Sequence, residues 1–159
     1  MRRSTGILIA VFALFLSACA GEPILGLVPP DTAESETVEV FVATNRQGLT
    51  GAKQALRSHK TRHFMLTARI PPDRVSGEMA LPARRTDPDR HFLVKSIVET
   101  PSEAQFIRNI RRSLAARPAT ERELALFVHG YNTNFAFGVM RVAQLHHDLG
   151  YPGVISHFS

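Results

Sequence analysis

The chain has 159 residues, of which 44% are hydrophobic and 21% are charged. That length allows one domain with a sizeable core, and the composition excludes a disordered protein. The formal net charge is +5, but the basic residues are scattered and no aromatic residues alternate with them. Nucleic acid is therefore not an expected partner.

The N-terminus has the composition of an export signal. Arg2 and Arg3 are followed by an apolar stretch at residues 7–16, ILIAVFALFL. This stretch is too short for a membrane-spanning helix, which needs about 20 residues. A basic start, a short apolar segment and then small residues predict a signal peptide over residues 1–18.

Residues 16–19 (LSAC) resemble a bacterial lipobox, in which the signal is cut before the cysteine and the cysteine thiol is lipidated. Cys19 is the only cysteine, so an internal disulfide is excluded. The resemblance implies a membrane partner, reached through lipidated Cys19, in the bacterial cell envelope. Ala20 at the next position favours the outer membrane, with the domain facing the periplasm. The alternative is a plain secretory signal.

Residues 19–37 are rich in proline, glycine and small polar residues, which predicts a tether between the lipid and a domain at residues 38–159. Some apolar residues of the tether could nevertheless dock on another part of the protein: Ile24, Leu25, Leu27 and Val28.

Three segments rich in β-branched and aromatic residues predict strands: residues 38–44 (VEVFVAT), 63–70 (HFMLTARI) and 92–98 (FLVKSIV). The polar residues 73–90 predict a loop, with at most a short edge strand around residues 77–81.

A helix is expected after Pro101, because the periodicity changes there. Ser102 and Gln105 have the spacing of a capping box. The helix is expected to end at Pro118, and one face of it is apolar, formed by Phe106, Ile107, Ile110 and Leu114.

Residues 123–128 (ELALFV) are apolar almost throughout, which predicts a central strand covered on both faces. A helix at residues 134–149, stopped by Gly150, and a short strand at residues 152–158 follow. This order predicts an α/β sheet with an antiparallel N-terminal edge. The sequence stops on what reads as an interior strand, so we expect a fragment that leaves an outer edge unpaired at residues 153–158.

The stretch LFVHGYNTNF at residues 126–135 ends the apolar strand in a histidine, a glycine and small polar residues. Ligands of α/β sheets bind beyond the carboxyl ends of the strands. Gly130 allows a sharp turn there, and the amides of Tyr131 and Asn132 can then point outward. Such amides are suited to stabilising a negative oxygen in acyl transfer. Asn132 and Asn134 could equally be turn and N-cap residues.

LFVHGYNTNF, the following helix and DLGYPGVISHFS (residues 148–159) resemble the N-terminal half of the α/β-hydrolase superfamily, in particular exported bacterial hydrolases of esterase or lipase type. VFVATNR at residues 40–46 fits the same branch. The resemblance implies a partial α/β-hydrolase sheet with helices on both faces and its C-terminal half missing. It implies an oxyanion hole shaped by His129 and Gly130, with a backbone amide of Tyr131 or Asn132 as donor, and a small ester or amide substrate.

The family's nucleophile lies in a G-x-S-x-G elbow, followed by an acid and a histidine. No serine of this chain has a glycine both two residues before and two after it, so we expect no catalytic triad residue here. Two interpretations remain: a truncated serine hydrolase, or a non-catalytic envelope lipoprotein or binding module. No cofactor is expected, and no metal, because His146 and His147 point about 100° apart on a helix and no H-E-x-x-H spacing exists.

Overall fold

The computed structural model describes residues 22–159, so the predicted signal peptide and Cys19 lie outside the described residues. The elements, in chain order, are β1 (Thr37–Arg46), η2 (Ala52–Gln54), β2 (Arg57–Arg69), β3 (Leu93–Thr100), α2 (Glu103–Ala115), η3 (Ala119–Glu121), β4 (Leu124–Val128), α3 (Phe135–Asp148) and β5 (Val154–Phe158). In this part of the chain, no helix is long and apolar enough to span a bilayer.

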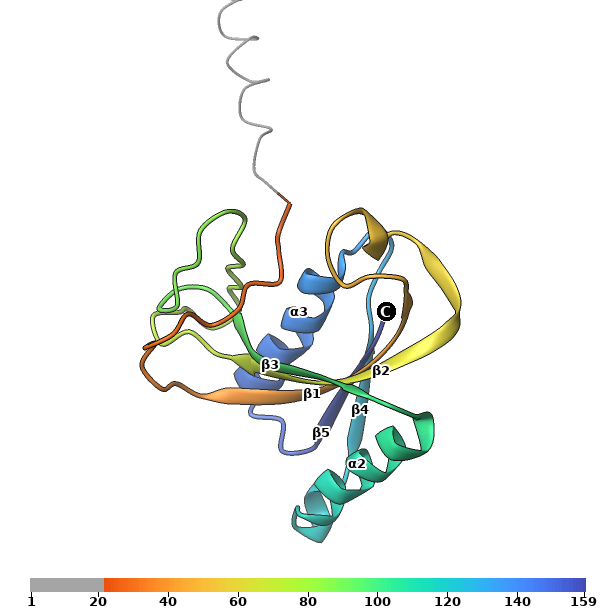
Figure 1. The fold of residues 1–159 in the computed structure, drawn as a ribbon. Coiled ribbons are helices and arrows are strands. Elements are labelled where there is room, and N and C mark those ends of the chain that lie inside the picture. Colours follow the sequence, from red (N-terminus) through yellow and green to blue (C-terminus); the bar gives the residue numbers. More distant parts are fainter. Residues whose placement is uncertain (1–21) are drawn as a thin grey trace, which may run out of the picture.

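The strands form one mixed sheet in the order β3-β2-β1-β5-β4 (Figure 1). β1, β2 and β3 pair in antiparallel fashion, whereas β5 pairs in parallel with both β1 and β4. The predicted α/β sheet with an antiparallel N-terminal edge is therefore confirmed.

The two helices cover opposite faces of the sheet (Figure 1). Val40 and Val42 of β1 are buried in one cluster with Phe135 of α3, while Phe41 lies in another with Phe106 of α2. Successive side chains of a strand point to opposite faces, so β1 alone supplies apolar residues to both cores. The expectation of helices on both faces is confirmed.

β4 lies at the edge of the sheet, and the prediction of a central strand covered on both faces is wrong. Its alternate residues are exposed: Leu124 at 46%, Leu126 at 62% and Val128 at 60%. The apolar composition of a strand does not reveal its position in the sheet, because the strand order depends on the connections between the strands. Here α3 returns the chain so that β5 enters the sheet between β1 and β4.

The expectation that residues 153–158 leave an open outer edge is wrong for the same reason. β5 has a partner on each side, and Val154 and Ile155 are buried at 3% and 2% exposure. Phe127 of β4 is half-buried and packs against the main core. Within residues 22–159, the edge strands of the sheet are β3 and β4.

The loop between β2 and β3 contains no strand, so the short edge strand considered around residues 77–81 is absent from it. The predicted tether docks instead. Val94 donates its amide to the Gly26 carbonyl at 2.8 Å, and Val28 donates to the Val94 carbonyl at 3.0 Å. Leu27 and Val94 thereby form an isolated parallel bridge along the outer side of β3. Of the apolar side chains of the tether, that of Leu25 packs against the main core, whereas those of Ile24 and Leu27 are exposed.

The helix caps follow the sequence in part. The Ser102 hydroxyl accepts from the Gln105 amide at 3.2 Å, but the Gln105 side chain donates to Asn109 and does not reach back. Ile107 lies off the buried face, with 39% exposure. Asn134 caps α3, because its Oδ1 accepts from the Phe137 amide at 2.7 Å.

Candidate functional site

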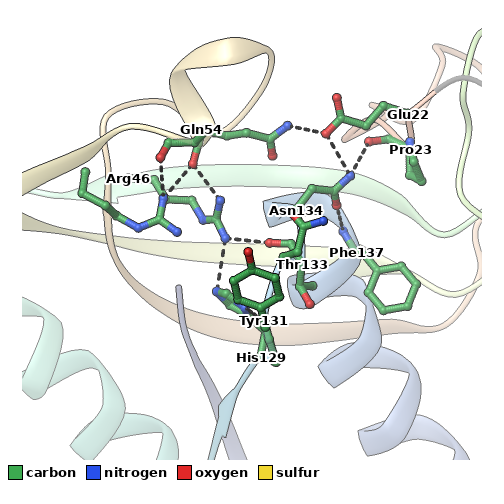
Figure 2. A pocket seen from close by; sticks show the side chains of 13 residues that line it. Glu22, Pro23, Arg46, Gln54, His129, Tyr131, Thr133, Asn134 and Phe137 are labelled. Carbon is green, nitrogen blue, oxygen red and sulfur yellow. Dashed lines mark hydrogen bonds between the residues drawn. The ribbon is translucent and has the colours of Figure 1, made fainter.

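A pocket of about 910 Å³ opens at the carboxyl ends of β1 and β4 and at the start of α3 (Figure 2). All four oxyanion-hole candidates line it: His129, Gly130, Tyr131 and Asn132. The remaining lining residues come from the segment before β1, from β1 and β2, from the connection between them, and from the α3 region: Glu22, Pro23, Arg46, Gln54, Ala55, Arg57, Thr133, Asn134 and Phe137.

Arg46, the last residue of β1, connects the elements around this pocket. It is 3% exposed, and its guanidinium donates to four acceptors. Nη1 donates to the Gln54 carbonyl at 2.7 Å and Nε to the Ser159 hydroxyl at 2.5 Å. Nη2 donates to the Thr133 carbonyl at 2.7 Å and to His129 Nε2 at 3.1 Å. The ends of β1 and β5 and the loop after β4 are thereby held together (Figure 2).

The contact with Arg46 fixes the tautomer of His129. A guanidinium can only donate, so Nε2 of His129 accepts and the ring proton lies on Nδ1. Nδ1 then donates to the Gly130 carbonyl, 2.7 Å away. Both ring nitrogens are engaged within the protein, which leaves His129 as a residue that positions the loop and not as a general base.

This hydrogen bond also orients the peptide between Gly130 and Tyr131. In a trans peptide the N–H points opposite to the C=O, so the Tyr131 amide points away from the His129 ring. Within residues 22–159, the amides of Tyr131 and Asn132 have no hydrogen-bond partner. Asn132 has a φ of 55°, the left-handed conformation that turns the chain into α3. The loop thus presents the amides of Tyr131 and Asn132 as unpaired backbone donors beside the pocket.

Two of the first three amides of α3 are used by the protein itself. The Phe135 amide donates to Gln54 Oε1 at 3.0 Å, and the Phe137 amide donates to Asn134 Oδ1. Asn134 additionally donates from Nδ2 to the Pro23 carbonyl at 3.1 Å. The Ala136 amide has no partner within residues 22–159, so unpaired donors lie both in the loop and in the first turn of the helix.

His157 lies beneath the site and does not line the pocket. It is fully buried, near the rings of Phe127, His129 and Phe135. Its Nδ1 is 3.3 Å from the Phe127 carbonyl, whereas Nε2 has no partner in the described chain. Burial is the main reason that the pKa of His157 is lowered to about 4. The ring is neutral near pH 7 and acts as a core residue.

Ser159 follows β5 and is 4% exposed. Its hydroxyl accepts from Arg46, and its carbonyl accepts from the Asn45 amide at 3.1 Å and the Thr44 hydroxyl at 2.7 Å. Within the described residues, no imidazole nitrogen is hydrogen-bonded to its hydroxyl. An activated serine needs an adjacent base, so Ser159 has the geometry of a structural residue.

The paired histidines of α3 point to different partners. Nε2 of His147 lies 2.8 Å from a Glu36 carboxylate oxygen, and Nε2 of His146 lies 3.3 Å from the Gly153 carbonyl. Burial is the main cause of the lowered pKa of His146. Both residues tie α3 to neighbouring segments.

Sequence reasoning did not identify Arg46, Gln54 or Thr133 as site residues. Arg46 carries the one usable signal, since an arginine at the end of the apolar strand VFVATNR needs acceptors if that strand end is covered. Thr133 contributes a backbone carbonyl, which any residue possesses, so its identity gives no signal. Gln54 contributes its side chain as well as its carbonyl, but its partners Glu22 and Phe135 are far away in the sequence, so no local pattern points to it.

Comparison with known proteins supports the architecture. Residues 102–159 match the family described as "Alpha/beta hydrolase of unknown function (DUF900)". No curated protein and no solved structure matches the chain. The matched segment comprises α2, β4, the loop with the unpaired amides, α3 and β5. Together with the mixed sheet and its two covering helices, this match supports an α/β-hydrolase-like scaffold.

Proposed function

We propose that this chain carries the oxyanion-stabilising side of a serine-hydrolase site that cleaves small esters or amides. The observation that carries the proposal is the pair of unpaired amides at Tyr131 and Asn132, held beside the pocket by the contacts of Arg46 and His129. Fixed donors need no reorganisation when charge develops on the substrate oxygen. Loss of one such donor in other hydrolases lowers kcat by roughly 10²–10³-fold.

The reaction that fits this geometry is acyl transfer. A serine oxygen attacks the substrate carbonyl carbon and loses its proton to a base, while the carbonyl π electrons move onto the oxygen. The two amides donate to that oxygen in the tetrahedral intermediate. When the carbonyl re-forms, the bond to the leaving alcohol or amine breaks and the leaving group takes the proton.

The nucleophile, acid and histidine base of this proposal are not among the 159 residues. The sequence contains no G-x-S-x-G elbow, and His129 and Ser159 are both committed to Arg46. We propose that a serine, an acid and a histidine from other sequence complete the site. We also propose that lipidated Cys19 holds the domain at the bacterial outer membrane, on its periplasmic side.

A second candidate is a non-catalytic envelope lipoprotein that binds small molecules in the same pocket. The missing nucleophile favours it, since an open pocket of about 910 Å³ is compatible with binding alone.

The first experiment compares the 159-residue chain with a chain extended by the DNA that follows the Ser159 codon, in each frame. We expect the extended protein to hydrolyse short p-nitrophenyl esters and to react with a fluorophosphonate at a serine, and the 159-residue chain to do neither. Turnover with serine labelling in the 159-residue chain would place the nucleophile among its residues. Inactivity of every extended chain would favour the binding protein.

A matched pair of substitutions tests the amides themselves. Glycine tolerates the positive φ of Asn132, whereas a β-branched residue does not. In the extended enzyme, Asn132→Gly should keep kcat within a few fold, and Asn132→Val should lower it by about 10²-fold because the loop amides move. Equal activity of the two variants would show that the amides of Tyr131 and Asn132 do not stabilise the oxyanion.

A further inference from the structure

Two arginines meet at one side of the pocket. Nη1 of Arg46 and Nη1 of Arg57 both donate to the Gln54 carbonyl oxygen, at 2.7 Å and 2.9 Å. Within residues 22–159, neither guanidinium forms an ion pair with a carboxylate. Burial is the main cause of the lowered pKa of Arg46, and the positive charge of Arg57 is the second. Two like charges therefore lie close together without a counter-ion.

Arg57 has its binding edge free. Nη1 also lies 3.4 Å from the Ala55 carbonyl, but Nε and Nη2 have no hydrogen-bond partner in the described chain. These two nitrogens form the edge of a guanidinium that holds a carboxylate or phosphate through two parallel hydrogen bonds. Arg57 is exposed and lines the pocket, so a ligand can reach this edge. Arg46 has one N–H left, on Nη1.

The acidic residue that lines the pocket does not neutralise this pair. Oε1 of Glu22 accepts from Gln54 Nε2 at 2.9 Å and from Asn134 Nδ2 at 3.4 Å. It therefore lies on the α3 side of Gln54 (Figure 2), and no ion pair of Glu22 with Arg46 or Arg57 forms within residues 22–159. The formal charges of these three side chains sum to +1.

We propose that the pocket selects a ligand with an anionic group, a carboxylate or a phosphate, which Arg57 holds at its free edge while Arg46 supplies a second positive charge. The inference rests on the proposed function in one respect: the susceptible carbonyl of the same ligand lies at the amides of Tyr131 and Asn132. The substrate class is then an ester or amide that carries a negative charge on its acyl or leaving group. The pocket volume of about 910 Å³ accommodates both groups of such a molecule.

Binding is measured without turnover, so that failure here leaves the hydrolysis proposal intact and failure of hydrolysis leaves this one intact. The full chain in detergent micelles is titrated with inorganic phosphate, with acetate and with neutral acetamide, and the amide signals of Tyr131, Asn132 and Thr133 are followed by NMR. We expect saturable shifts with an anion and none with acetamide. The anion that binds more tightly identifies the group: acetate indicates a carboxylate ligand and phosphate a phosphorylated one.

Variants assign the site. Arg57→Gln should weaken anion binding at least about tenfold, and Arg57→Lys should retain part of it, because a lysine keeps the charge but loses the two-pronged edge. Arg111→Gln, which removes one positive charge from an exposed position of α2, should bind like the unmodified chain. The proposal is overturned by an absence of saturable binding, by equal shifts with acetamide, or by an equal loss in the Arg111 and Arg57 glutamine variants.

Discussion

His157 packs directly against α3 at Gly138, where a Cβ atom would lie 2.8 Å from Nε2 and 2.9 Å from Cε1 of the histidine. Such a separation is shorter than a van der Waals contact, and His157 is fully buried, so its ring has no space into which to move. Gly138 is needed for this close approach, although a glycine within a helix costs about 1 kcal/mol relative to alanine.

Gly138→Ala is therefore expected to lower the free energy of unfolding by about 1–3 kcal/mol in spite of its better helix propensity. In a His157→Ala background the same change should be neutral or stabilising, because the clash is gone. Urea unfolding of the four proteins gives the coupling energy. Equal destabilisation in both backgrounds would show that the contact is not the cause.

Stability should fall in mild acid because of His157. Its pKa is about 4 in the folded state, lowered mainly by burial, against 6.5 ordinarily. Between these pH values only the unfolded chain binds the proton. The contribution of the neutral His157 ring to the free energy of unfolding is therefore complete above about pH 6.5 and disappears as the pH falls to about 4. The gap corresponds to roughly 3 kcal/mol. His146, whose pKa is also lowered by burial, adds to the same trend.

The test is urea unfolding across that pH range. His157→Asn should flatten the dependence, since asparagine does not titrate, and His146→Asn should reduce it less. A dependence unchanged by His157→Asn would contradict the assignment.

Asp148, the last residue of α3, anchors the loop between β2 and β3. It accepts from the Gly77 amide at 2.8 Å and from Gln144 Nε2 at 2.6 Å, and it pairs with Arg74 and with His147. Burial on its own would raise the Asp148 pKa, but these hydrogen bonds outweigh it and hold the pKa below its ordinary value. The carboxylate thus stabilises the fold at neutral pH and loses this effect in strong acid.

Asp148→Asn is expected to cost about 3 kcal/mol, because the buried guanidinium of Arg74 loses its counter-charge. Trypsin should then cut faster in residues 73–91, where several arginines lie. Asp73→Asn makes the same charge change at an exposed position of this loop and serves as the control. Equal cleavage of both variants would exclude the anchoring role.

Arg46→Lys should destabilise the protein by about 2 kcal/mol or more, because an ammonium has three donors and cannot serve four acceptors in a plane. His129 Nε2 would lose its donor, and the ring would be free to take the other tautomer. Imidazole ¹⁵N shifts report the tautomer, and urea unfolding reports the stability. Arg57→Lys, at an exposed position, should change neither the His129 tautomer nor the free energy of unfolding. An unchanged tautomer in Arg46→Lys would show that Arg46 does not orient His129.

The exposed edge of β4 is expected to cause self-association. Leu126 and its neighbours present an unpaired apolar strand, which is a template for pairing with another chain. Leu126→Lys should lower the association seen by size-exclusion chromatography more than Leu149→Lys, which changes an exposed residue outside β4. A monodisperse wild-type protein with a sharp cooperative melt would refute this expectation.

The sequence by itself determined the local features of the fold. The β-branched and aromatic residues at 38–44 specified a strand, and Ser102 and Asn134 specified helix starts, because strand propensity and capping depend on residues a few positions apart. The HGYN stretch indicated a pocket at that place for the same reason, because an apolar strand followed by glycine and polar residues is recognisable within ten residues.

Only the tertiary structure decided the position of β4 at the sheet edge and the role of Arg46. The strand order depends on where α3 returns the chain, and apolar content is the same for either position. Arg46 meets His129 across 83 residues and Ser159 across 113. No local pattern encodes such partners, because a buried guanidinium takes whichever acceptors the assembled sheet places around it.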